Sequence, residues 1–250
     1  MMLQSALIFQ KNSRQTILSD LHTDFGHLQS KYRVVRKPIS PDALMLERAA
    51  LQHEYISRHD FSRPIVLIDS DILINGPLAP LFEKDFDVAL TWRDNADMPI
   101  NGGLIILNNR RPEITKRFFS KFTSIYNANH STRAAWYGDQ LALRDYVGLN
   151  VEEFKNKDII EIDGCRILLL PCEIYNFSPD NRYGSITSDL ATKTILHFKG
   201  QRKNLMPYFW HAWLRPKISF NPWWRIKARQ WRKKIHELSA SEPPFSRKNK

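Results

Sequence analysis

An apolar run that ends in two aspartates constrains the fold more than any other stretch of the chain. Pro64-Ile65-Val66-Leu67-Ile68 leads into Asp69-Ser70-Asp71, after which the strand is expected to resume as Ile72-Leu73-Ile74. Consecutive apolar residues are typical of a central strand covered on both faces of a sheet, where a carboxylate without a partner is costly. Side chains at i and i+2 of an extended backbone point to the same side. The stretch therefore predicts a buried strand that brings Asp69 and Asp71 to one divalent cation, although a plain turn after a strand uses the same residue types.

Length and composition favour one α/β domain. The 250 residues are 42% hydrophobic, which is enough for a sizeable core. No stretch approaches the roughly 20 consecutive apolar residues of a membrane span, and no basic region precedes an apolar signal core at the N-terminus. We therefore expect a cytoplasmic chain that can bind peripherally at the inner face of the membrane. Cys165 and Cys172 are too few for a disulfide framework or a cysteine metal cluster, and we expect both to be buried thiols.

Helical and extended patterns alternate along the chain. A serine N-cap at Ser40, followed by Pro41, predicts the start of a helix that runs to about His59, and Asp139 is a capping candidate for a later helix. Further helices are predicted at 2–9 and 113–126, a short helical piece at 78–83, and strands at 15–18, 32–37, 86–92, 104–107, 166–170 and 194–198. A glycine turn is expected at Asn101-Gly102-Gly103. Alternation of this kind predicts an α/β sheet flanked by helices.

The C-terminal stretch differs in composition from the rest of the chain. Residues 206–250 hold eleven Lys or Arg, two Glu and five Trp, so they carry +9 of the formal net charge of +11. Aromatic rings settle at the depth of lipid headgroups while basic side chains reach the phosphates, so this tail predicts binding to an anionic membrane. Residues 221–238 suit one amphipathic helix. Packing of the tail on the rest of the protein is the alternative, and no nucleic-acid partner is expected because the remainder is nearly neutral.

Four short motifs follow one another along the chain. They are Asp69-Ser70-Asp71, Asn101-Gly102-Gly103, Asp139-Gln140 and a segment from His197 through Gly200 to Lys203. Each is weak alone. In this order and spacing they resemble the motifs of GT-A glycosyltransferases, most closely the family 8 enzymes and related nucleotide-diphospho-sugar transferases. The resemblance covers roughly residues 1–205, and it implies a Rossmann-like mixed sheet flanked by helices.

The resemblance assigns a metal and a phosphate site. Asp69 and Asp71 suit Mn²⁺ or Mg²⁺ as hard oxygen donors, and His197 is the implied third ligand, which favours Mn²⁺. Without that context a histidine in this position would more often be a core residue. Lys203 and Lys199 are implied to hold the phosphates of a nucleotide-sugar donor, expected to be UDP-linked, with Gly200 allowing close approach.

The remaining motifs are implied to surround the sugars. Asn101 and Gly102 would line the donor pocket, and Arg48 matches a basic position that reaches the donor, although a helix arginine is usually solvated. Asp139 and Gln140 would lie near the reacting carbon. The histidine-glycine segment is similar to that of retaining enzymes, which use no dedicated base. An inverting enzyme would need one, and Asp139 or Asp94 is then the candidate.

The start of the chain departs from this pattern. The family usually begins with a strand that holds the base and ribose of the nucleotide, whereas residues 2–7 already suggest the following helix. We therefore expect a sheet without its first strand, or a shortened chain, and weak nucleotide binding. The predicted organisation is a GT-A domain over 1–205 and a basic aromatic extension over 206–250.

The function expected from the resemblance is metal-dependent transfer of a sugar from a nucleotide donor. The tail points to a membrane-associated glycan or lipid-linked acceptor, such as a precursor of a surface polysaccharide. Two alternatives remain. One is a non-catalytic relative that binds a partner and keeps the metal motif, and the other is a metal-dependent phosphoryl transferase or nuclease using the same aspartates.

Overall fold

The computed structural model describes residues 1–133, 136–179, 190–219 and 221–241, without the side chains of residue 133 and of residues 236–241. The chain forms two compact units. The sheet unit comprises Arg14–Leu67 and Lys84–Pro171, and the terminal unit comprises Met1–Ser13, Ile68–Glu83 and Cys172–Lys250. The boundary expected at residue 205 is not a border of either unit, so the division into 1–205 and 206–250 stays a prediction.

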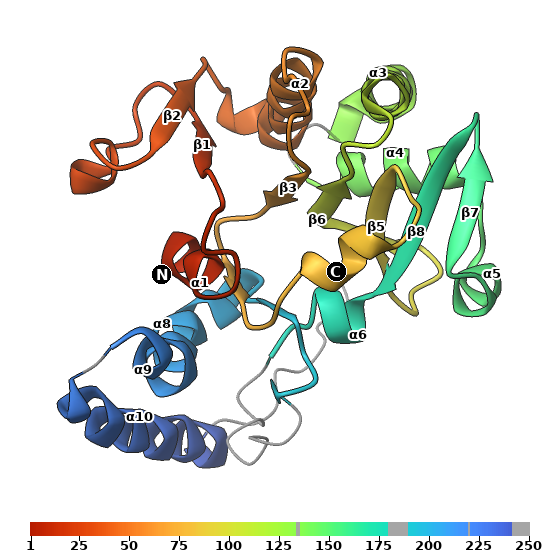
Figure 1. Ribbon diagram of the computed structural model, residues 1–250. Coiled ribbons are helices and arrows are strands. Elements are labelled where there is room, and N and C mark those ends of the chain that lie inside the picture. The colour runs from red at the N-terminus through yellow and green to blue at the C-terminus, as the bar shows by residue number, and fades with distance from the viewer. Residues whose placement is uncertain (134–135, 180–189, 220, 242–250) are drawn as a thin grey trace. The chain divides into compact units, whose positions relative to one another are not determined.

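A five-stranded mixed sheet is the centre of the sheet unit (Figure 1). Its strands are β3 (Ile65–Ile68), β6 (Ile100–Leu107), β5 (Val88–Trp92), β8 (Cys165–Pro171) and β7 (Ile159–Ile162), in this spatial order. β5 runs antiparallel to β6 and parallel to β8. The predicted α/β sheet flanked by helices is confirmed.

The strand before the aspartates occupies a different place from the one predicted. β3 lies at an edge of the five-stranded sheet, and its residues alternate between buried and half-buried. The prediction of a central strand covered on both faces is therefore wrong. An edge strand differs from a central one in pairing with a neighbour on one side only. An apolar run of this length does not by itself distinguish the two.

Helices pack on the sheet through a core rich in aromatic side chains. They are α2 (Leu44–Ser57), α3 (Pro112–Asn129), α4 (Gly138–Val147) and α5 (Val151–Asn156). The spacing of Phe118, Phe119 and Phe122 on α3 predicted core positions, and all three are at most 1% exposed. Full burial of such a side chain contributes about 1.5–3 kcal/mol. These residues therefore hold α3 in place and are not available as a stacking platform for a ligand.

Two short strands pair separately from the five-stranded sheet. β1 (Thr16–Ser19) and β2 (Arg33–Arg36) form a parallel two-stranded sheet, within one or two residues of the predicted bounds. The turn at Pro41–Ala43 is a 3-10 helix, and α2 follows it. The Ser40 side chain makes no capping bond; the Ser40 backbone N–H instead donates to the Glu47 carboxylate at 2.7 Å. The Glu47 carboxylate, in the first turn of α2, thus binds the backbone N–H of Ser40 itself, although Ser40 does not cap the helix with its side chain.

The terminal unit is built on a short antiparallel ladder. β4 (Ile72–Ile74) pairs with β9 (Ile195–His197), and the hydroxyl of Ser5 in α1 (Met2–Phe9) accepts the Ile74 N–H at 2.9 Å. The other elements are α6 (Cys172–Tyr175), 3-10 helices at Ala79–Glu83 and Gly200–Leu205, α8 (Met206–Phe209), a π-helical turn at Trp210–Leu214, α9 (Arg215–Ile218) and α10 (Pro222–Ser241). The predicted helix at 2–9 and the strand after the aspartates are confirmed.

Much of the basic aromatic tail packs inside the terminal unit. Trp210 is 3% exposed, and Ile235 of α10 is fully buried in the same core. The His211 ring stacks on Trp224 and on Trp231, with centroids 5.8 and 5.0 Å apart. The Arg215 guanidinium lies 3.4 Å from the Trp224 ring centroid. These ring contacts lie within the tail and fasten α10 to the preceding helices. The packing alternative is supported for Trp210 and Ile235, because their core cluster also contains Leu73 and Phe198 from outside the tail.

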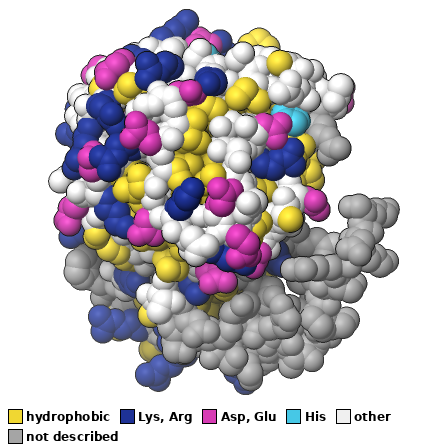
Figure 2. All heavy atoms as spheres, turned by 90° about the vertical axis from the view of Figure 1, so that its right-hand side faces the viewer, with side chains coloured by type: hydrophobic (Ala, Val, Ile, Leu, Met, Phe, Trp, Pro, Cys, Tyr) yellow, Lys and Arg dark blue, Asp and Glu magenta, His cyan; other side chains and the backbone are white. Residues whose placement is uncertain are grey.

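Other side chains of the tail remain at the surface. Trp223 and Ile226 are 47% and 61% exposed, and Ile218 of α9 is 45% exposed. Within the described residues, no helix is both long enough and apolar enough to cross a bilayer. Figure 2 shows Lys and Arg side chains mixed with Asp and Glu side chains on the face that it presents.

The two cysteines differ in environment. Cys165 is 2% exposed, and burial raises the pKa of its thiol to about 12. Cys172 is half-buried, so the prediction of a buried thiol holds only for Cys165.

Candidate functional site

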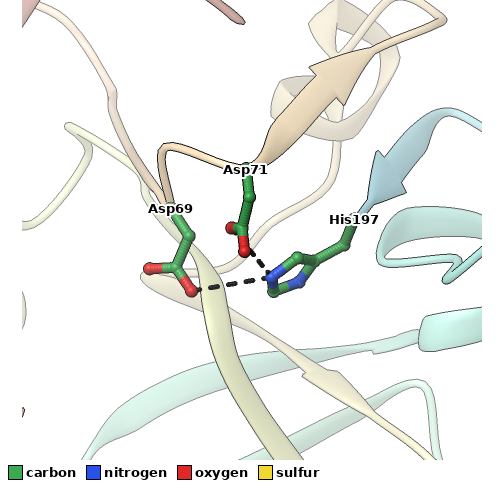
Figure 3. Close-up of side chains that lie close together, drawn as sticks. All are labelled: Asp69, Asp71 and His197. Carbon is green, nitrogen blue, oxygen red and sulfur yellow. Dashed lines mark ion pairs between the residues drawn. The ribbon is translucent and has the colours of Figure 1, made fainter. Parts of the chain in front are cut away.

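Asp69, Asp71 and His197 meet at one point of the terminal unit (Figure 3). One ligand atom from each lies within 4.8 Å of the others. The His197 Nε2 is 3.2 Å from Asp71 Oδ1 and 3.7 Å from Asp69 Oδ2. Two motifs that are far apart in the sequence therefore form one cluster.

Strand pairing explains this convergence. Ile72, next to Asp71, is directly opposite His197 in the β4–β9 ladder, and the Phe198 N–H donates to the Asp71 carbonyl at 2.8 Å. The two carboxylates do not stand on continuous extended backbone as predicted, because β3 ends at Ile68 and β4 begins at Ile72. They lie in the turn between these strands, and the turn still directs both toward the imidazole (Figure 3).

The His197 side of the cluster is buried, whereas the side next to Lys203 is exposed to solvent. The side chains of His197, Asp71 and Asp69 are 5%, 13% and 27% exposed. Lys203 Nζ lies 3.3 Å from Asp71 Oδ2 and is 60% exposed. Burial raises the pKa of the Asp71 carboxyl, but the hydrogen bond and charge of His197 and the charge of Lys203 outweigh it, so the net pKa lies below its ordinary value. The ionised carboxylate, which is the metal-binding form, is therefore favoured.

The three side chains fit a divalent cation. A six-coordinate ion with ligands near 2.1 Å places neighbouring ligand atoms about 3 Å apart, and the distances from His197 Nε2 to the two carboxylate oxygens are 3.2 and 3.7 Å. Two carboxylates and one imidazole match the donor types that Mn²⁺ accepts, and the open side leaves room for other ligands. Asp69, Asp71 and His197 could thus hold Mn²⁺, or Mg²⁺ with less contribution from the imidazole.

The basic segment after β9 forms a tight turn. Gly200 begins the 3-10 helix Gly200–Leu205 with φ of +56°, and nothing lies within 4 Å of the position that a Cβ would take. The glycine is therefore explained by its left-handed backbone, not by close approach of a neighbouring group. Lys199 precedes this turn and is half-buried, and Lys203 lies within it.

A second cluster lies within the sheet unit. Arg48 of α2 donates to the Asp139 carboxylate of α4 at 2.5 Å, and their side chains are 25% and 4% exposed. A Cβ on Gly102 would lie 2.7 Å from Asp139 Oδ2 and 3.6 Å from the Arg48 guanidinium. Three positions that the sequence identified separately are therefore neighbours, and a glycine is needed where the β6 backbone passes the ion pair.

The local structure at two of these positions differs from the prediction. Asn101 and Gly102 belong to strand β6, beside an irregularity in its pairing with β5, and do not form a turn. Asp139 is not a cap: Tyr137 occupies the N-cap position with φ of +64°, and no side chain caps α4. The buried ion pair with Arg48 explains Asp139 instead.

Tyr126 of α3 closes the inner side of this cluster. It is fully buried, and burial together with the Asp139 charge raises the pKa of its hydroxyl to about 12, against a smaller opposing effect of Arg48. A Cβ on Gly138 would overlap the Tyr126 ring. Glycine at the first position of α4 is therefore a packing requirement, and it sets how closely Asp139 approaches α3.

The other predicted site residues make ordinary hydrogen bonds or a surface ion pair. The Gln140 side-chain oxygen accepts from Arg93 at 3.1 Å, and the Asn101 side-chain oxygen accepts the Gly103 N–H at 3.0 Å. Asp94 is 73% exposed and lies 3.2 Å from Lys155 Nζ. An open hollow of about 850 Å³ between α2 and α3 contains none of the predicted site residues, so we give it no role.

The predicted residues thus form two groups. Asp69, Asp71, His197, Lys199, Gly200 and Lys203 belong to the terminal unit, and Arg48, Asn101, Gly102, Asp139 and Gln140 belong to the sheet unit. Sequence reasoning missed Asn176, whose side-chain oxygen lies 2.7 Å from His197 Nδ1. No motif marks this asparagine, because it depends on a contact between distant segments.

Comparison with known proteins supports the fold through structure alone. The sequence matches no protein-family model and no curated protein. A crystal structure of an active-site mutant of LgtC is similar with a TM-score of 0.50 at 13% identity, over 97% of this chain and 91% of that one. LgtC in complex with donor and acceptor sugar analogs, described as a galactosyltransferase, gives 0.49 at 14% identity with the same coverage. The apo-form glycosyltransferase GlyE of Streptococcus pneumoniae TIGR4 gives 0.45 at 15% identity, over 94% of this chain and 66% of that one. The chain therefore has a GT-A-like fold.

Proposed function

We propose that this chain is a metal-dependent glycosyltransferase that moves a sugar from a nucleotide-sugar donor to a glycan or lipid-linked acceptor. The observation that carries the proposal is the convergence of Asp69, Asp71 and His197 in a chain with a GT-A-like fold. The fold alone would not indicate an activity. A site with two carboxylates and one imidazole adds a chemical reason for this activity.

The metal cluster would bind the diphosphate of the donor, expected to be UDP-linked. A bound Mn²⁺ neutralises negative charge that grows on a diphosphate leaving group as the glycosidic bond breaks. Lys203, which lies 3.3 Å from Asp71, supplies a cation on the open side of the cluster, where phosphate oxygens would approach. Lys199 and Gly200 are proposed to contribute to the same phosphate site.

The cluster in the sheet unit would serve the sugars. Arg48, Asn101 and Gly102 are proposed to line the donor-sugar pocket, and Asp139 and Gln140 the side of the reacting carbon. Because Arg48 already holds the buried Asp139 carboxylate, that group is better suited to a fixed charge than to taking up a proton. Asp94 is exposed and lies beside Lys155. This arrangement favours a retaining enzyme, which needs no dedicated base.

A panel of nucleotide sugars with Mn²⁺ tests the proposal. We expect slow release of nucleoside diphosphate and free sugar from one donor, dependent on Mn²⁺. Binding of donor without any turnover would instead identify a non-catalytic relative. Cleavage of a phosphodiester substrate, with no release from sugar nucleotides, would favour a phosphoryl transferase. The expected weak nucleotide affinity is checked by isothermal titration of UDP with Mn²⁺.

We also propose that the exposed part of the tail binds an anionic membrane, where a lipid-linked acceptor would be found. Trp223 and Ile226 are three residues apart on α10 and so share a face, and the Lys227 ammonium lies 4.6 Å from the Trp223 ring centroid. Apolar side chains beside basic ones suit insertion at headgroup depth, and each basic residue near the surface contributes about 1 kcal/mol.

Replacing Trp223 and Ile226 together by serine is expected to reduce sedimentation with phosphatidylserine-containing vesicles at least about threefold, since two inserted side chains are lost. Leu21→Ser is the matched control, because Leu21 is 48% exposed but lies in the sheet unit. Equal sedimentation of the double variant and the wild type would contradict membrane binding through this surface.

A further inference from the structure

We infer that Asn176 is a positioning residue that orients His197 for metal binding, an inference that rests on the proposed metal site. The His197 Nδ1 lies 2.7 Å from the Asn176 side-chain oxygen. An amide oxygen can only accept a hydrogen bond, so the proton must be on Nδ1. The opposite ring nitrogen, Nε2, then faces Asp69 and Asp71 (Figure 3).

Burial makes this hydrogen bond specific. As whole residues, Asn176 is 1% exposed and His197 is 4% exposed, so water does not readily replace either partner. A buried imidazole with an unsatisfied Nδ1–H would be costly, and a ring flip would put carbon atoms where Nδ1 now faces the amide and Nε2 faces the carboxylates. The amide oxygen therefore selects one tautomer and one ring orientation.

The backbone holds Asn176 and His197 in register. The Asn176 N–H donates to the Cys172 carbonyl at 3.0 Å, which ties it to α6. Phe177, the next residue, donates its N–H to Ile195 at 3.0 Å and accepts the His197 N–H at 2.7 Å. The segment that carries the amide is thus bonded directly to β9, the strand that carries the imidazole.

These contacts explain what the amide contributes. Metal-binding histidines generally donate their second N–H to an oxygen, and loss of that partner typically lowers metal affinity 10–100-fold. An amide orients the ring without adding a third negative charge to two carboxylates. Asn176 would therefore preset the Nε2 lone pair toward the cation while the charge of the site remains that of Asp69 and Asp71.

Mn²⁺ binding measured from the EPR signal of the free ion tests the inference. Asn176→Leu, which keeps a similar side-chain volume, is expected to bind Mn²⁺ 10–100-fold more weakly. Asn176→Asp keeps an acceptor at the same place and is expected to restore affinity to within about threefold of the wild type. Asn75→Leu is the control, because Asn75 also lies in the terminal unit but donates to the Leu190 and Lys193 carbonyls. It should leave the affinity unchanged.

A second readout needs no metal. Long-range ¹H–¹⁵N correlations of the His197 ring, assigned by their absence in His197→Gln, should show a proton on Nδ1 in the wild type, whether or not Nε2 also carries a proton toward the carboxylates. Asn176→Leu should populate the Nε2–H tautomer.

The outcomes separate the inference from the proposed function. A wild type that binds no Mn²⁺ at millimolar concentration overturns the metal site itself. If the wild type binds Mn²⁺ and folded Asn176→Leu binds it equally well, only the role of Asn176 is overturned. A wild-type ring that carries no proton on Nδ1 has the same consequence.

Discussion

Asp71→Asn is expected to lower both Mn²⁺ affinity and donor turnover about a hundredfold or more, because it removes a charged ligand from the centre of the cluster. Asp71 lies 3.2 Å from His197 and 3.3 Å from Lys203, so its carboxylate joins the metal cluster to the proposed phosphate site. An amide at this position keeps the shape of the side chain and loses the charge that would balance a divalent ion.

The measurement combines thermal unfolding with donor hydrolysis. At Mn²⁺ about 100-fold above its dissociation constant, binding should stabilise the wild type by about 2.7 kcal/mol, and this gain should disappear in Asp71→Asn. Asp60→Asn is the control, since its side chain is 76% exposed and lies in the sheet unit. Unchanged Mn²⁺ stabilisation in Asp71→Asn would show that Asp71 is not a ligand.

Arg48→Met is expected to lower the free energy of unfolding of the sheet unit by about 3 kcal/mol. Breaking a buried ion pair by removing one partner costs about 3–5 kcal/mol, and we expect the lower end because a quarter of the Arg48 side chain is exposed. The Asp139 carboxylate is 4% exposed, so it loses the guanidinium that balances its charge and gains little water in exchange.

Arg144→Met provides the matched control for this prediction. Arg144 pairs with Asp145 at 2.8 Å in the same unit, but their side chains are 36% and 32% exposed, so its loss should cost less than about 1 kcal/mol. Urea unfolding gives the two values, and hydrogen exchange in α4 localises the effect. Combining Arg48→Met with Asp139→Asn should cost less than the sum of the single changes. Equal effects of Arg48→Met and Arg144→Met would mean that the buried pair contributes no special stability.

Local sequence patterns predicted most of the elements well. The helix at 2–9, the strands before and after Asp69 and Asp71, and the core positions of α3 follow from apolar spacing within a few residues. These features depend on interactions between near neighbours, so a short window contains the necessary information. The convergence of His197 on the aspartates was reached through resemblance to a family and not through spacing.

Errors arose where a distant segment decides the outcome. Asp139 has the residue type and position of a helix cap, yet its carboxylate is bound by Arg48 from another helix. Asn101 and Gly102 look like a turn, but both belong to β6, where Asn101 pairs with Thr91 of β5. In both cases a long-range contact overrides the local preference, as tertiary context commonly does.

For this protein the sequence alone determined that two carboxylates follow an apolar strand, because this feature depends only on the order of a few neighbouring residues. Tertiary structure decided what surrounds them. The β4–β9 ladder brings His197 to Asp71, and the contact of Phe177 with β9 brings Asn176 to His197. The physical reason is that a metal site requires donor atoms within a few ångströms of one another, and only strand pairing between distant segments sets those distances.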